Sequence, residues 1–375
     1  MLRILVFGMS TGMGGVETFL MNLYRNMDIN KLQLDFVIEG DSCYYSDEIK
    51  SLGGKIYFIT PRKESMIQNI IDLIKLYKKC RTTYKIVYFN LSSLYYNFQY
   101  IIARFFKFPV IVVHSHSARA KNVTKNLRYY LHCLNRLHVS LTADYMFSCS
   151  KPAAEWIFGK KRAKKVKIVP NAINCNLYTY NEEIRKKTRE ELGIKEDQFV
   201  VGNVGRFTYV KNHLFILDIF KKIIEYNKNS VLLLVGDGEL KNDVEKAISK
   251  HNLNKNVLLT GQRTDVPKLL QAMDVFILPS LYEGLPYSLI EAQASGLKCF
   301  ASTGVPHESN ITGLVDYIDL EADADFWAKE IINKTLNERS KMVDVIKVAG
   351  FDIKNTSNYM QEFFLKQKTI LAQER

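Results

Sequence analysis

The stretch "DVFILPSLYEGLPYSLIEAQASGLKCFAS" (residues 274–302) is typical of an α/β protein. Its apolar start, 274–280, predicts a buried strand. Pro286 favours the first turn of a helix, because that position needs no partner for a backbone N–H. We expect the helix over 287–295, with Gly296 as its C-terminal cap, before the chain enters a second apolar run. This order predicts two parallel strands joined by a helix.

The same alternation recurs along the chain in two series. The first series of expected strands is "LRILVFG", "LQLDFVIEG", "KIYFIT", "KIVYFNL", "PVIVVHS", "DYMFSCS" and "KVKIVP", and the second is "FVVGNVGRF", "SVLLLVGDG", "NVLLTGQ", "DVFILPS" and "KCFAS". Amphipathic stretches such as "MIQNIIDLIKLYKKC" lie between strands. Residues 170–183 show neither periodicity and begin with Pro-Asn, so we expect a hinge there. The sequence therefore predicts two doubly wound, Rossmann-like α/β domains that face each other across a ligand-binding cleft.

The composition is that of a globular protein, since 47% of the 375 residues are hydrophobic and 24% are charged. No apolar run approaches the roughly 18 residues that indicate a membrane span. The first ten residues are expected to form a strand rather than a signal peptide. The six cysteines show no CxxC pair and no metal-ligand spacing, which favours a reduced, cytoplasmic setting.

Charge is distributed unevenly along the chain. Residues 1–170 contain 26 Lys and Arg against 11 Asp and Glu, a net charge of +15. Residues 171–375 contain 26 against 28, a net charge of −2. The basic first part predicts an anionic partner, either nucleic acid or a membrane surface.

Two glutamates, Glu283 and Glu291, lie on either side of the expected helix start. The N-terminus of that helix offers free N–H groups and a partial positive charge, which suit an anion. Gly284 permits unusual backbone angles in the loop before the helix. The two carboxylates are thus placed to contact opposite ends of a ligand with a phosphate in its middle. Helix capping and solvent exposure would explain two isolated glutamates, but the strand and the Gly-Leu-Pro loop before the helix favour the ligand.

A second candidate cluster contains Arg206, which follows an expected strand, and Lys211, at the start of the next helix. A lysine at a helix N-terminus opposes the helix dipole, at a cost of up to ~1 kcal/mol. An anion between Arg206 and Lys211 would turn that cost into an attraction. The pair predicts a phosphate site, with solvent-exposed cations as the alternative.

A third candidate is the glycine-rich turn "GMSTGMGGVETF" (8–19), where Gly14 and Gly15 would let the backbone approach a ligand closely. Neither the G-x-G-x-x-G fingerprint nor the P-loop pattern is present. Glu39, at the end of the second expected strand, still leaves a dinucleotide-dependent oxidoreductase open as an alternative.

His114 and His116 are two positions apart at the end of an expected strand, so their side chains should point the same way. A third metal ligand is missing nearby, and a purely structural role is the alternative to a place in the site. Asp323 and Asp325 stand before an expected helix, where capping is favoured over metal binding. The sequence therefore predicts no metal site.

Several motifs stand in a characteristic order: "GGVETF", "HSHS", "VGRFTYVKNH", "LLLVGDGEL" and "PSLYEGLPYSLIEAQASGL". Together they resemble the retaining family-4 glycosyltransferases of the GT-B fold, and more closely the bacterial branch that assembles capsular and exopolysaccharides. The resemblance extends to "FSCSKPAAEWIFG", "VPNAIN" and "LLQAMDVFILPS", so it spans nearly the whole chain. It implies transfer of a hexosyl group from a nucleotide sugar, most commonly UDP-linked, without a metal or other cofactor.

The resemblance also implies roles for individual residues. Arg206 and Lys211 would hold the donor diphosphate and stabilise the leaving group. Glu291 would bind the ribose hydroxyls and Glu283 the transferred sugar. His116 would contact that sugar near the reacting centre. The further expected contacts are Gly15 with the phosphates or the acceptor, and the backbone N–H groups around Gly284, Leu285 and Ser288 with sugar and phosphate.

We accordingly expect an acceptor-binding domain at 1–170, a donor-binding domain at 171–355 and a helix at 356–375 that returns to the first domain. The acceptor implied by the resemblance is a lipid-linked saccharide. A nucleotide-sugar epimerase would share the fold and the phosphate contacts and is the first alternative. A basic nucleic-acid-binding protein is the second, but no nucleic-acid-binding motif accompanies the charge.

Basic and aromatic residues alternate in "IIARFFKF" (101–108) and "KNVTKNLRYYLHCLNRLH" (121–138). Several basic side chains near an anionic leaflet, with aromatics in the headgroup layer, hold a protein at a membrane. We therefore expect peripheral binding at the inner face of the cell membrane. For "IIARFF" alone, the buried side of a helix is an equally good interpretation.

Overall fold

The computed structural model describes residues 1–96, 98–117, 127–335 and 338–373. The chain forms two compact units, which we call unit 1 (Met1–Ala172 with Ile353–Arg375) and unit 2 (Ile173–Asp352). The chain thus passes between the units twice. The sequence had suggested divisions after residues 170 and 355, and the contacts place them after 172 and 352.

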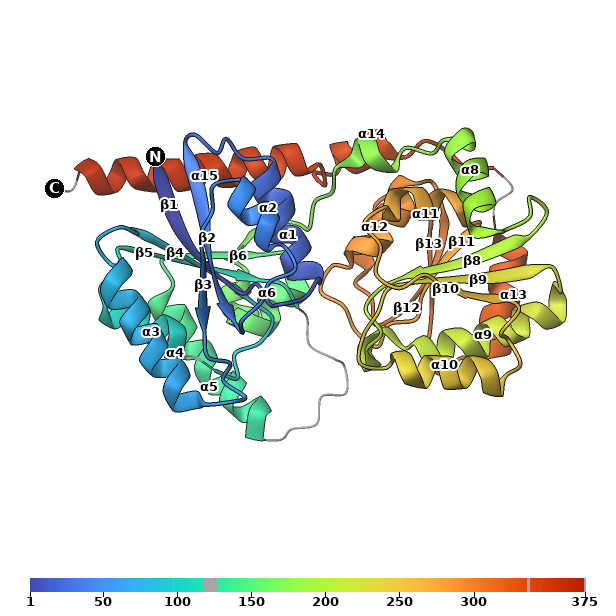
Figure 1. Cartoon of the computed structure of the whole chain (residues 1–375), viewed down its shortest axis with the longest axis horizontal. Coiled ribbons are helices and arrows are strands. Elements are labelled where there is room, and N and C mark those ends of the chain that lie inside the picture. Colours follow the sequence, from blue (N-terminus) through green and yellow to red (C-terminus); the bar gives the residue numbers. More distant parts are fainter. Residues whose placement is uncertain (97, 118–126, 336–337, 374–375) are drawn as a thin grey trace. The chain divides into compact units, whose positions relative to one another are not determined.

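Unit 1 contains a seven-stranded parallel sheet in the order β3-β2-β1-β4-β5-β6-β7. Its strands are β1 (Leu2–Phe7), β2 (Leu32–Glu39), β3 (Ile56–Ile59), β4 (Ile86–Leu91), β5 (Val110–Ser115), β6 (Tyr145–Ser148) and β7 (Lys167–Ile168). Its helices are α1 (Gly15–Arg25), α2 (Ser46–Ser51), α3 (Met66–Cys80), α4 (Phe98–Phe105), α5 (Leu127–Thr142), α6 (Lys151–Phe158), α7 (Lys160–Ala163) and α15 (Ile353–Gln373). Helices cover both faces of the sheet (Figure 1).

Unit 2 contains a six-stranded parallel sheet in the order β10-β9-β8-β11-β12-β13. Its strands are β8 (Phe199–Val204), β9 (Ser230–Val235), β10 (Val257–Leu259), β11 (Val275–Leu278), β12 (Lys298–Ser302) and β13 (Val315–Ile318). Its α-helices are α8 (Glu182–Leu192), α9 (His213–Tyr226), α10 (Lys241–Lys250), α11 (Val266–Ala272), α12 (Tyr287–Ala294), α13 (Ala324–Lys334) and α14 (Val343–Val348). Three short 3₁₀ turns complete it: η1 (Cys175–Tyr178), η2 (Tyr209–Lys211) and η3 (His307–Ser309).

Both sheets share the doubly wound arrangement in which the strand order reverses beside the first strand. The expected fold class, two parallel-sheet Rossmann-like domains, is confirmed. The central strands are buried on both faces, as in β4 and β9, which explains their continuous apolar sequences. The expected strands all occur, but the sequence analysis missed β13, a short edge strand in which Asp316 interrupts the apolar pattern.

The C-terminal helix α15 packs within unit 1. The ring of Phe364 lies 5.4 Å from that of Tyr88, and Phe363 lies 5.0 Å from Phe147. The side chain of Gln361 accepts a hydrogen bond from the Asp28 N–H at 2.6 Å. These contacts explain why the last segment of the chain belongs to the same unit as the first.

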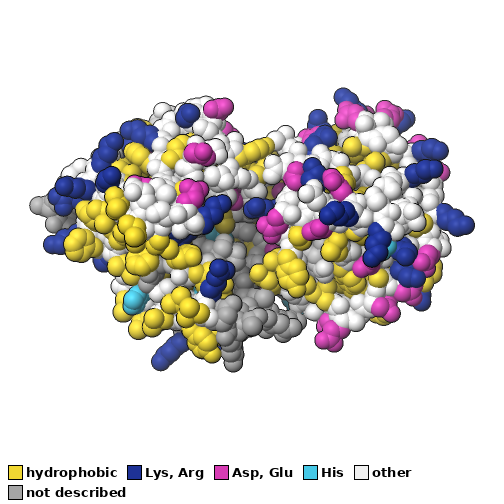
Figure 2. Space-filling view, turned by 60° about the horizontal axis from the view of Figure 1, so that its bottom comes forward, with side chains coloured by type: hydrophobic (Ala, Val, Ile, Leu, Met, Phe, Trp, Pro, Cys, Tyr) yellow, Lys and Arg dark blue, Asp and Glu magenta, His cyan; other side chains and the backbone are white. Residues whose placement is uncertain are grey.

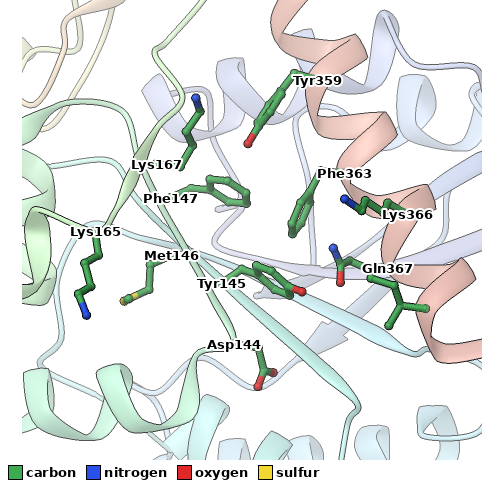
Figure 3. A pocket seen from close by; sticks show the side chains of 11 residues that line it. Asp144, Tyr145, Met146, Phe147, Lys165, Lys167, Tyr359, Phe363, Lys366 and Gln367 are labelled. Carbon is green, nitrogen blue, oxygen red and sulfur yellow. The ribbon is translucent and has the colours of Figure 1, made fainter. Parts of the chain in front are cut away.

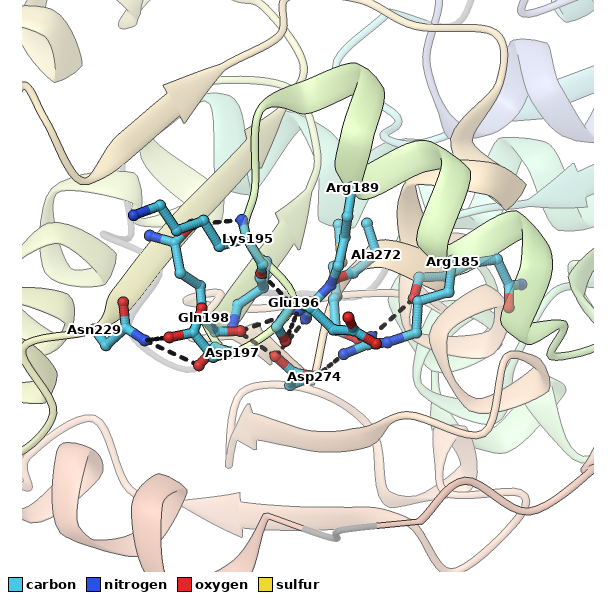
Figure 4. Close-up of polar contacts among 12 residues, drawn as sticks. Arg185, Arg189, Lys195, Glu196, Asp197, Gln198, Asn229, Ala272 and Asp274 are labelled. Carbon is cyan, nitrogen blue, oxygen red and sulfur yellow. Dashed lines mark hydrogen bonds and ion pairs between the residues drawn. The ribbon is translucent and has the colours of Figure 1, made fainter.

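At the amino ends of β8 and β11, unit 2 is held together by a largely buried charged network (Figure 4). The Asp274 carboxylate pairs with Arg185 at 2.6 Å and Arg189 at 2.7 Å, and also accepts the Val200 N–H at 2.7 Å. Arg189 donates further to the carbonyl of Ala272 at 3.0 Å. Because every charge in this network has partners, its burial is compensated and it ties α8 to the sheet. It leaves the carboxyl ends of the strands free for other residues.

Among the described residues no helix is long and apolar enough to cross a membrane. All six cysteines are free. A surface hollow of about 550 Å³ lies beside β6, β7 and α15 in unit 1, with Phe147 and Phe363 among its aromatic walls (Figure 3). It adjoins the amino end of β6, where none of the expected site residues lies.

Candidate active site

The candidate residues of unit 2 follow the two neighbouring strands β8 and β11, between which the strand order reverses. Connections diverge from such a point, which leaves room for a ligand at the carboxyl ends of the strands. Arg206 follows β8, while Glu283 and the start of α12 follow β11. The topology therefore gathers residues that are about 80 positions apart in the sequence.

The turn that carries Arg206 is held by the glycine-rich turn after β9. The Phe207 N–H donates to the carbonyl of Asp237 at 3.0 Å, and the Leu240 N–H donates to that of Phe207 at 3.0 Å. A Cβ atom at Gly238 would lie 2.5 Å from the Phe207 carbonyl oxygen, so only glycine fits there. This close packing fixes the backbone of the turn, and the Arg206 side chain is left exposed.

Lys211 and Glu283 form a direct ion pair, with Lys211 Nζ 2.7 Å from Glu283 Oε1. The Leu281 N–H donates to the Val210 carbonyl at 2.8 Å and holds the two loops together. The side chains are 19% and 14% exposed, respectively, so the pair is largely shielded from water.

Contrary to the sequence prediction, Lys211 does not lie at the start of a helix. Lys211 ends the turn η2 and lies two residues before α9, so it does not stand in the first turn of that helix. Its counterion in the structure is Glu283, and no dipole penalty is left for a ligand to relieve. The lysine was expected beside a phosphate and the glutamate beside a sugar, and their contact was not foreseen.

The expected helix after the Gly-Leu-Pro loop is confirmed as α12. Pro286 directly precedes it, and Gly296 follows it in the left-handed conformation with φ of 71°. Leu285 and Ser288 are buried at its start. Gly284 is buried as well, so the loop and the helix start form a compact surface of backbone groups at the end of β11.

Glu291, one turn inside α12, accepts a hydrogen bond from the Tyr178 hydroxyl at 2.6 Å. Burial raises the pKa of the Glu291 carboxyl, while the Tyr178 hydrogen bond and the charge of Lys211 act in the opposite direction. Tyr178 belongs to η1, in the segment that the sequence analysis treated only as a hinge. Its part in the cluster was missed because that segment has no periodicity.

His213, the first residue of α9, is a second residue that the sequence analysis did not assign. Its ring packs 4.3 Å from that of Phe207 and is almost fully buried. Burial and then the charge of Lys211 lower the pKa of His213 to about 3, so the imidazole is neutral. The positive groups at this strand end are therefore Arg206 and Lys211.

In unit 1 the glycine-rich turn connects β1 to α1 and wraps around a buried acid. Glu17 is 6% exposed and its carboxylate accepts the Ser10 N–H at 2.9 Å. A Cβ atom at Gly14 would lie 2.7 Å from Glu17 Oε2, whereas one at Gly15 would meet no described atom within 4 Å. Gly15 thus borders open space, as a residue that approaches a ligand must.

His114 and His116 point the same way, as their spacing predicted, and their rings stack with centroids 4.2 Å apart. His116 Nε2 lies 2.9 Å from Asn90 Oδ1, and His114 Nδ1 lies 2.6 Å from the Tyr88 hydroxyl. Since the Asn90 amide nitrogen donates to the Phe7 carbonyl at 3.1 Å, its oxygen is the acceptor and His116 carries its proton on Nε2. Burial lowers the pKa of His116 to about 3, so both its nitrogens act as neutral hydrogen-bonding groups.

Asp323 caps α13, because its carboxylate accepts the Phe326 N–H at 2.8 Å. Asp325 pairs with Lys329 at 2.7 Å. The capping interpretation of this acidic run is confirmed. Within the described ranges, no three His, Cys, Asp or Glu side chains are placed to share a metal ion. Glu39 is paired with Arg62 at 2.7 Å.

Comparison with known proteins decides the family. Residues 184–343 match the family described as "Glycosyl transferases group 1". The putative glycosyltransferase EpsF of Bacillus subtilis is 32% identical over 347 residues, which cover 90% of each chain. The protein is a group 1 glycosyltransferase.

A second relative of this transferase is the UDP-Gal:alpha-D-GlcNAc-diphosphoundecaprenol alpha-1,3-galactosyltransferase of Escherichia coli. It is 34% identical over 218 residues, or 54% of each chain. Among solved structures, Anabaena Alr3699/HepE in complex with UDP and glucose matches 98% of this chain and 100% of that one, with a TM-score of 0.77 and 18% identity. That likeness shows the GT-B fold.

The candidate residues divide between the two units of this transferase. Arg206, Lys211, Glu283, Glu291 and the start of α12 belong to unit 2, where Lys211 pairs with Glu283 and Tyr178 donates to Glu291. His116 and Gly15 belong to unit 1. The cleft expected between the two domains stays a prediction.

Proposed function

We propose that this group 1 glycosyltransferase moves a hexosyl group from a UDP-sugar to a lipid-linked saccharide, with retention of the anomeric configuration, in the assembly of a bacterial capsule or exopolysaccharide. The observation that carries the proposal is the cluster at the end of β8 and β11, where the Lys211–Glu283 pair and the Tyr178–Glu291 pair flank the start of α12. The cluster offers cations for phosphates and carboxylates for hydroxyl groups.

In this proposal unit 2 binds the donor. The diphosphate lies against Lys211, Arg206 and the N–H groups at the start of α12, which carry partial positive charge. Glu291 accepts hydrogen bonds from the ribose hydroxyls, and Glu283 from hydroxyls of the transferred sugar. A bound diphosphate competes with Glu283 for Lys211, so donor binding loosens the ion pair and frees the glutamate for the sugar.

The chemical step breaks the bond between the sugar C1 and the diphosphate oxygen and forms a bond from C1 to the acceptor oxygen. For a retaining outcome we adopt attack from the side of the leaving group, in which the diphosphate takes the proton of the acceptor hydroxyl. Lys211 and Arg206 stabilise the charge that develops on the diphosphate. Neutral His116, whose one N–H is directed at Asn90, accepts a hydrogen bond from a sugar hydroxyl at Nδ1 and adds no charge to the site.

Two similar proteins and the properties of unit 1 support the proposed classes of donor and acceptor. The solved relative HepE is described in complex with UDP and glucose, and the E. coli relative is named for a UDP-sugar donor and a diphosphoundecaprenol-linked acceptor. Unit 1 would bind the acceptor, with Gly15 beside open space at the start of α1. The basic charge of residues 1–170 agrees with an acceptor held at an anionic membrane.

The proposal is tested by a transfer assay. The purified protein is first screened with UDP-, GDP- and ADP-sugars by thermal shift, and the best donor is then incubated with lipid-linked and water-soluble saccharides. We expect UDP-sugar binding and a product whose anomeric proton coupling, measured by NMR, matches that of the donor. Turnover of the donor without an acceptor would instead favour an epimerase, and an inverted product would contradict retention.

A further inference from the structure

Helix α5 in unit 1 presents a row of large apolar side chains to solvent. Successive members are three or four positions apart or adjacent, so they occupy one face of the helix. They are Tyr130, Leu131, Leu134, Leu137 and Leu141, which are 58%, 39%, 60%, 51% and 69% exposed. At 1.5 Å per residue, the sixteen-residue helix is about 24 Å long, and the row from Tyr130 to Leu141 extends over about 16 Å of it.

The opposite face of α5 is polar and points into unit 1. His132 and Asn135 are buried there and satisfied: the His132 ring accepts the Leu94 N–H at 3.0 Å, and Asn135 donates to the Leu94 carbonyl at 2.7 Å. The His132 ring also stacks on Trp156 at 3.6 Å. These contacts fix the rotation of the helix, so the leucine row cannot turn inward without breaking them.

Neighbouring helices extend the apolar surface. Phe105 at the end of α4 is 80% exposed and Ile67 at the start of α3 is 74% exposed. Ile101 and Ile102 are partly buried against the core of unit 1, so the buried-helix interpretation holds for that part of "IIARFF". Figure 2 shows the hydrophobic side chains gathered over this face of unit 1. Apolar patches of this extent mark interaction sites.

The charges on the same helices are positive with one exception. Between residues 66 and 142 the only acidic residue is Asp72, and it accepts hydrogen bonds from Thr60. Exposed basic side chains lie on these helices or directly after them: Lys75, Lys78, Lys79, Arg81, Lys107 and Arg128. Lys121 and Lys125, which the sequence analysis also placed on this surface, lie outside the described residues.

We propose that α3, α4 and α5 of unit 1 form a docking surface for an anionic lipid bilayer, with the leucine row of α5 in the boundary between headgroups and acyl chains. We call this the α5 surface. A long apolar row flanked by basic side chains is the pattern of helices that lie in a membrane interface. A second copy of the chain would bring like charges together, which disfavours self-association through the same surface. The proposal names the partner surface of the proposed function, because a lipid-linked acceptor is reached at the membrane.

The test is co-sedimentation of the full chain with vesicles of phosphatidylcholine alone or of phosphatidylcholine and phosphatidylglycerol in equal parts. We expect binding to the anionic vesicles only, weakened by added salt. Leu134→Gln with Leu141→Gln should reduce the partition coefficient about tenfold or more, since glutamine keeps helix propensity but removes apolar contact. Lys78→Gln with Lys79→Gln should reduce it about fivefold per lysine, because each contributes ~1 kcal/mol near an anionic surface.

The matched control is Val345→Gln with Val348→Gln, which alters two exposed valines on α14 in unit 2 and should leave binding unchanged. Circular dichroism confirms that each variant is folded. The proposal is overturned when wild type ignores anionic vesicles or when the Leu134/Leu141 variant binds them as well as the Val345/Val348 control does. It is also overturned when sedimentation equilibrium shows a wild-type dimer that the Leu134/Leu141 variant converts to a monomer. The Leu134/Leu141 variant should still transfer sugar to a water-soluble acceptor. If wild type binds anionic vesicles but shows no transfer, the proposed function is contradicted and the docking surface is not.

Discussion

At corresponding places in their sheets, the two units carry different chemistry. The reversal point of unit 2 has a cation–carboxylate pair, Lys211 with Glu283, beside Glu291. That of unit 1 has neutral hydrogen-bonding groups, His116 and Asn90, and one buried acid, Glu17. The net charge of +15 in residues 1–170 is therefore not concentrated at its strand ends, and a large part of it lies on α3 to α5. The same topology thus supports a charged site in one unit and a neutral site with a basic outer surface in the other.

Removal of the Lys211 cation from unit 2 should have the largest effect on activity. Lys211→Ala should lower kcat/KM for donor transfer by about 100-fold, which is the loss typical of one group that stabilises the developing charge. The protein should stay folded, but its melting temperature should fall because the variant leaves the largely shielded Glu283 carboxylate unpaired. Lys222→Ala, which removes an exposed pair with Glu225 in the same unit, is the control.

Since Lys211→Ala also leaves Glu283 without a counterion, the double variant with Glu283→Gln separates the two effects. Recovery of activity in the double variant would mean that the unpaired carboxylate, and not the missing cation, caused the loss. Equal kcat/KM in Lys211→Ala and wild type would remove Lys211 from the site.

The glycine turns of the two units should differ in what they tolerate. Gly238→Ala forces a Cβ to within 2.5 Å of the Phe207 carbonyl and should destabilise unit 2 by about 1–3 kcal/mol while weakening donor binding. Gly12→Ala in unit 1 adds a Cβ with no described atom within 4 Å and should be nearly neutral. Thermal unfolding of both variants tests the difference, and equal melting temperatures would show that the Arg206 turn does not depend on that contact.

The sequence predicts the arrangement of α12 well, because its signals are local. Pro286 and Gly296 mark the helix ends, and the apolar strand before it needs no knowledge of the rest of the chain. The stacking of His114 on His116 also follows from their spacing on a strand.

The contacts that make the cluster a site were not predictable in this way. Lys211 contacts Glu283 over a separation of 72 positions, and Tyr178 contacts Glu291 over 113. No local sequence pattern identifies the partner in either pair. The outward leucine row of α5 was likewise hidden, since helical periodicity locates an apolar face but does not say which face is buried. His132 and Asn135 decide that, through hydrogen bonds to Leu94.

A smaller effect is expected from the hydrogen bond that holds Glu291. Tyr178→Phe should raise the KM for UDP-sugar about tenfold, corresponding to ~1.4 kcal/mol for a hydrogen bond to a charged group. The effect should vanish with a donor that lacks the ribose hydroxyls, because the tyrosine acts through the carboxylate that binds them. Tyr180→Phe, which removes a tyrosine–glutamate contact two residues away, is the matched control.

Two outcomes of that experiment would test the role of Glu291 separately from that of Tyr178. When wild type itself does not distinguish the deoxy donor, Glu291 is not a ribose ligand. When wild type distinguishes it and Tyr178→Phe loses affinity equally for both donors, the tyrosine supports the fold and does not position the carboxylate.

The pH dependence of donor affinity should come from unit 2 and not from unit 1. Burial raises the pKa of Glu291, so its charged form is lost while the pH is still above the usual glutamate value, and KM should rise a few-fold as the pH is lowered from neutral toward that value. His116, with a pKa lowered to about 3, stays neutral over this range and adds no second pH-dependent change in KM. Tyr178→Phe removes a contact that lowers the Glu291 pKa and should move the midpoint to higher pH. An unchanged profile in Glu291→Gln would contradict the assignment.

The smallest effect is expected from metal removal. A divalent ion at a diphosphate supplies positive charge to the leaving group, and Lys211 with Arg206 offers that charge in unit 2 without an ion. The acidic pair closest in pattern to a metal site is already engaged, because Asp323 caps α13 and Asp325 binds Lys329. We therefore expect the donor turnover of the dialysed protein to be unchanged by excess EDTA, measured against the same preparation with added Mg²⁺ or Mn²⁺. A loss of turnover that either ion restores would assign part of the phosphate charge to a metal. The comparison between the charged groups at the strand ends of unit 2 and the neutral groups at those of unit 1 would then have to include that ion.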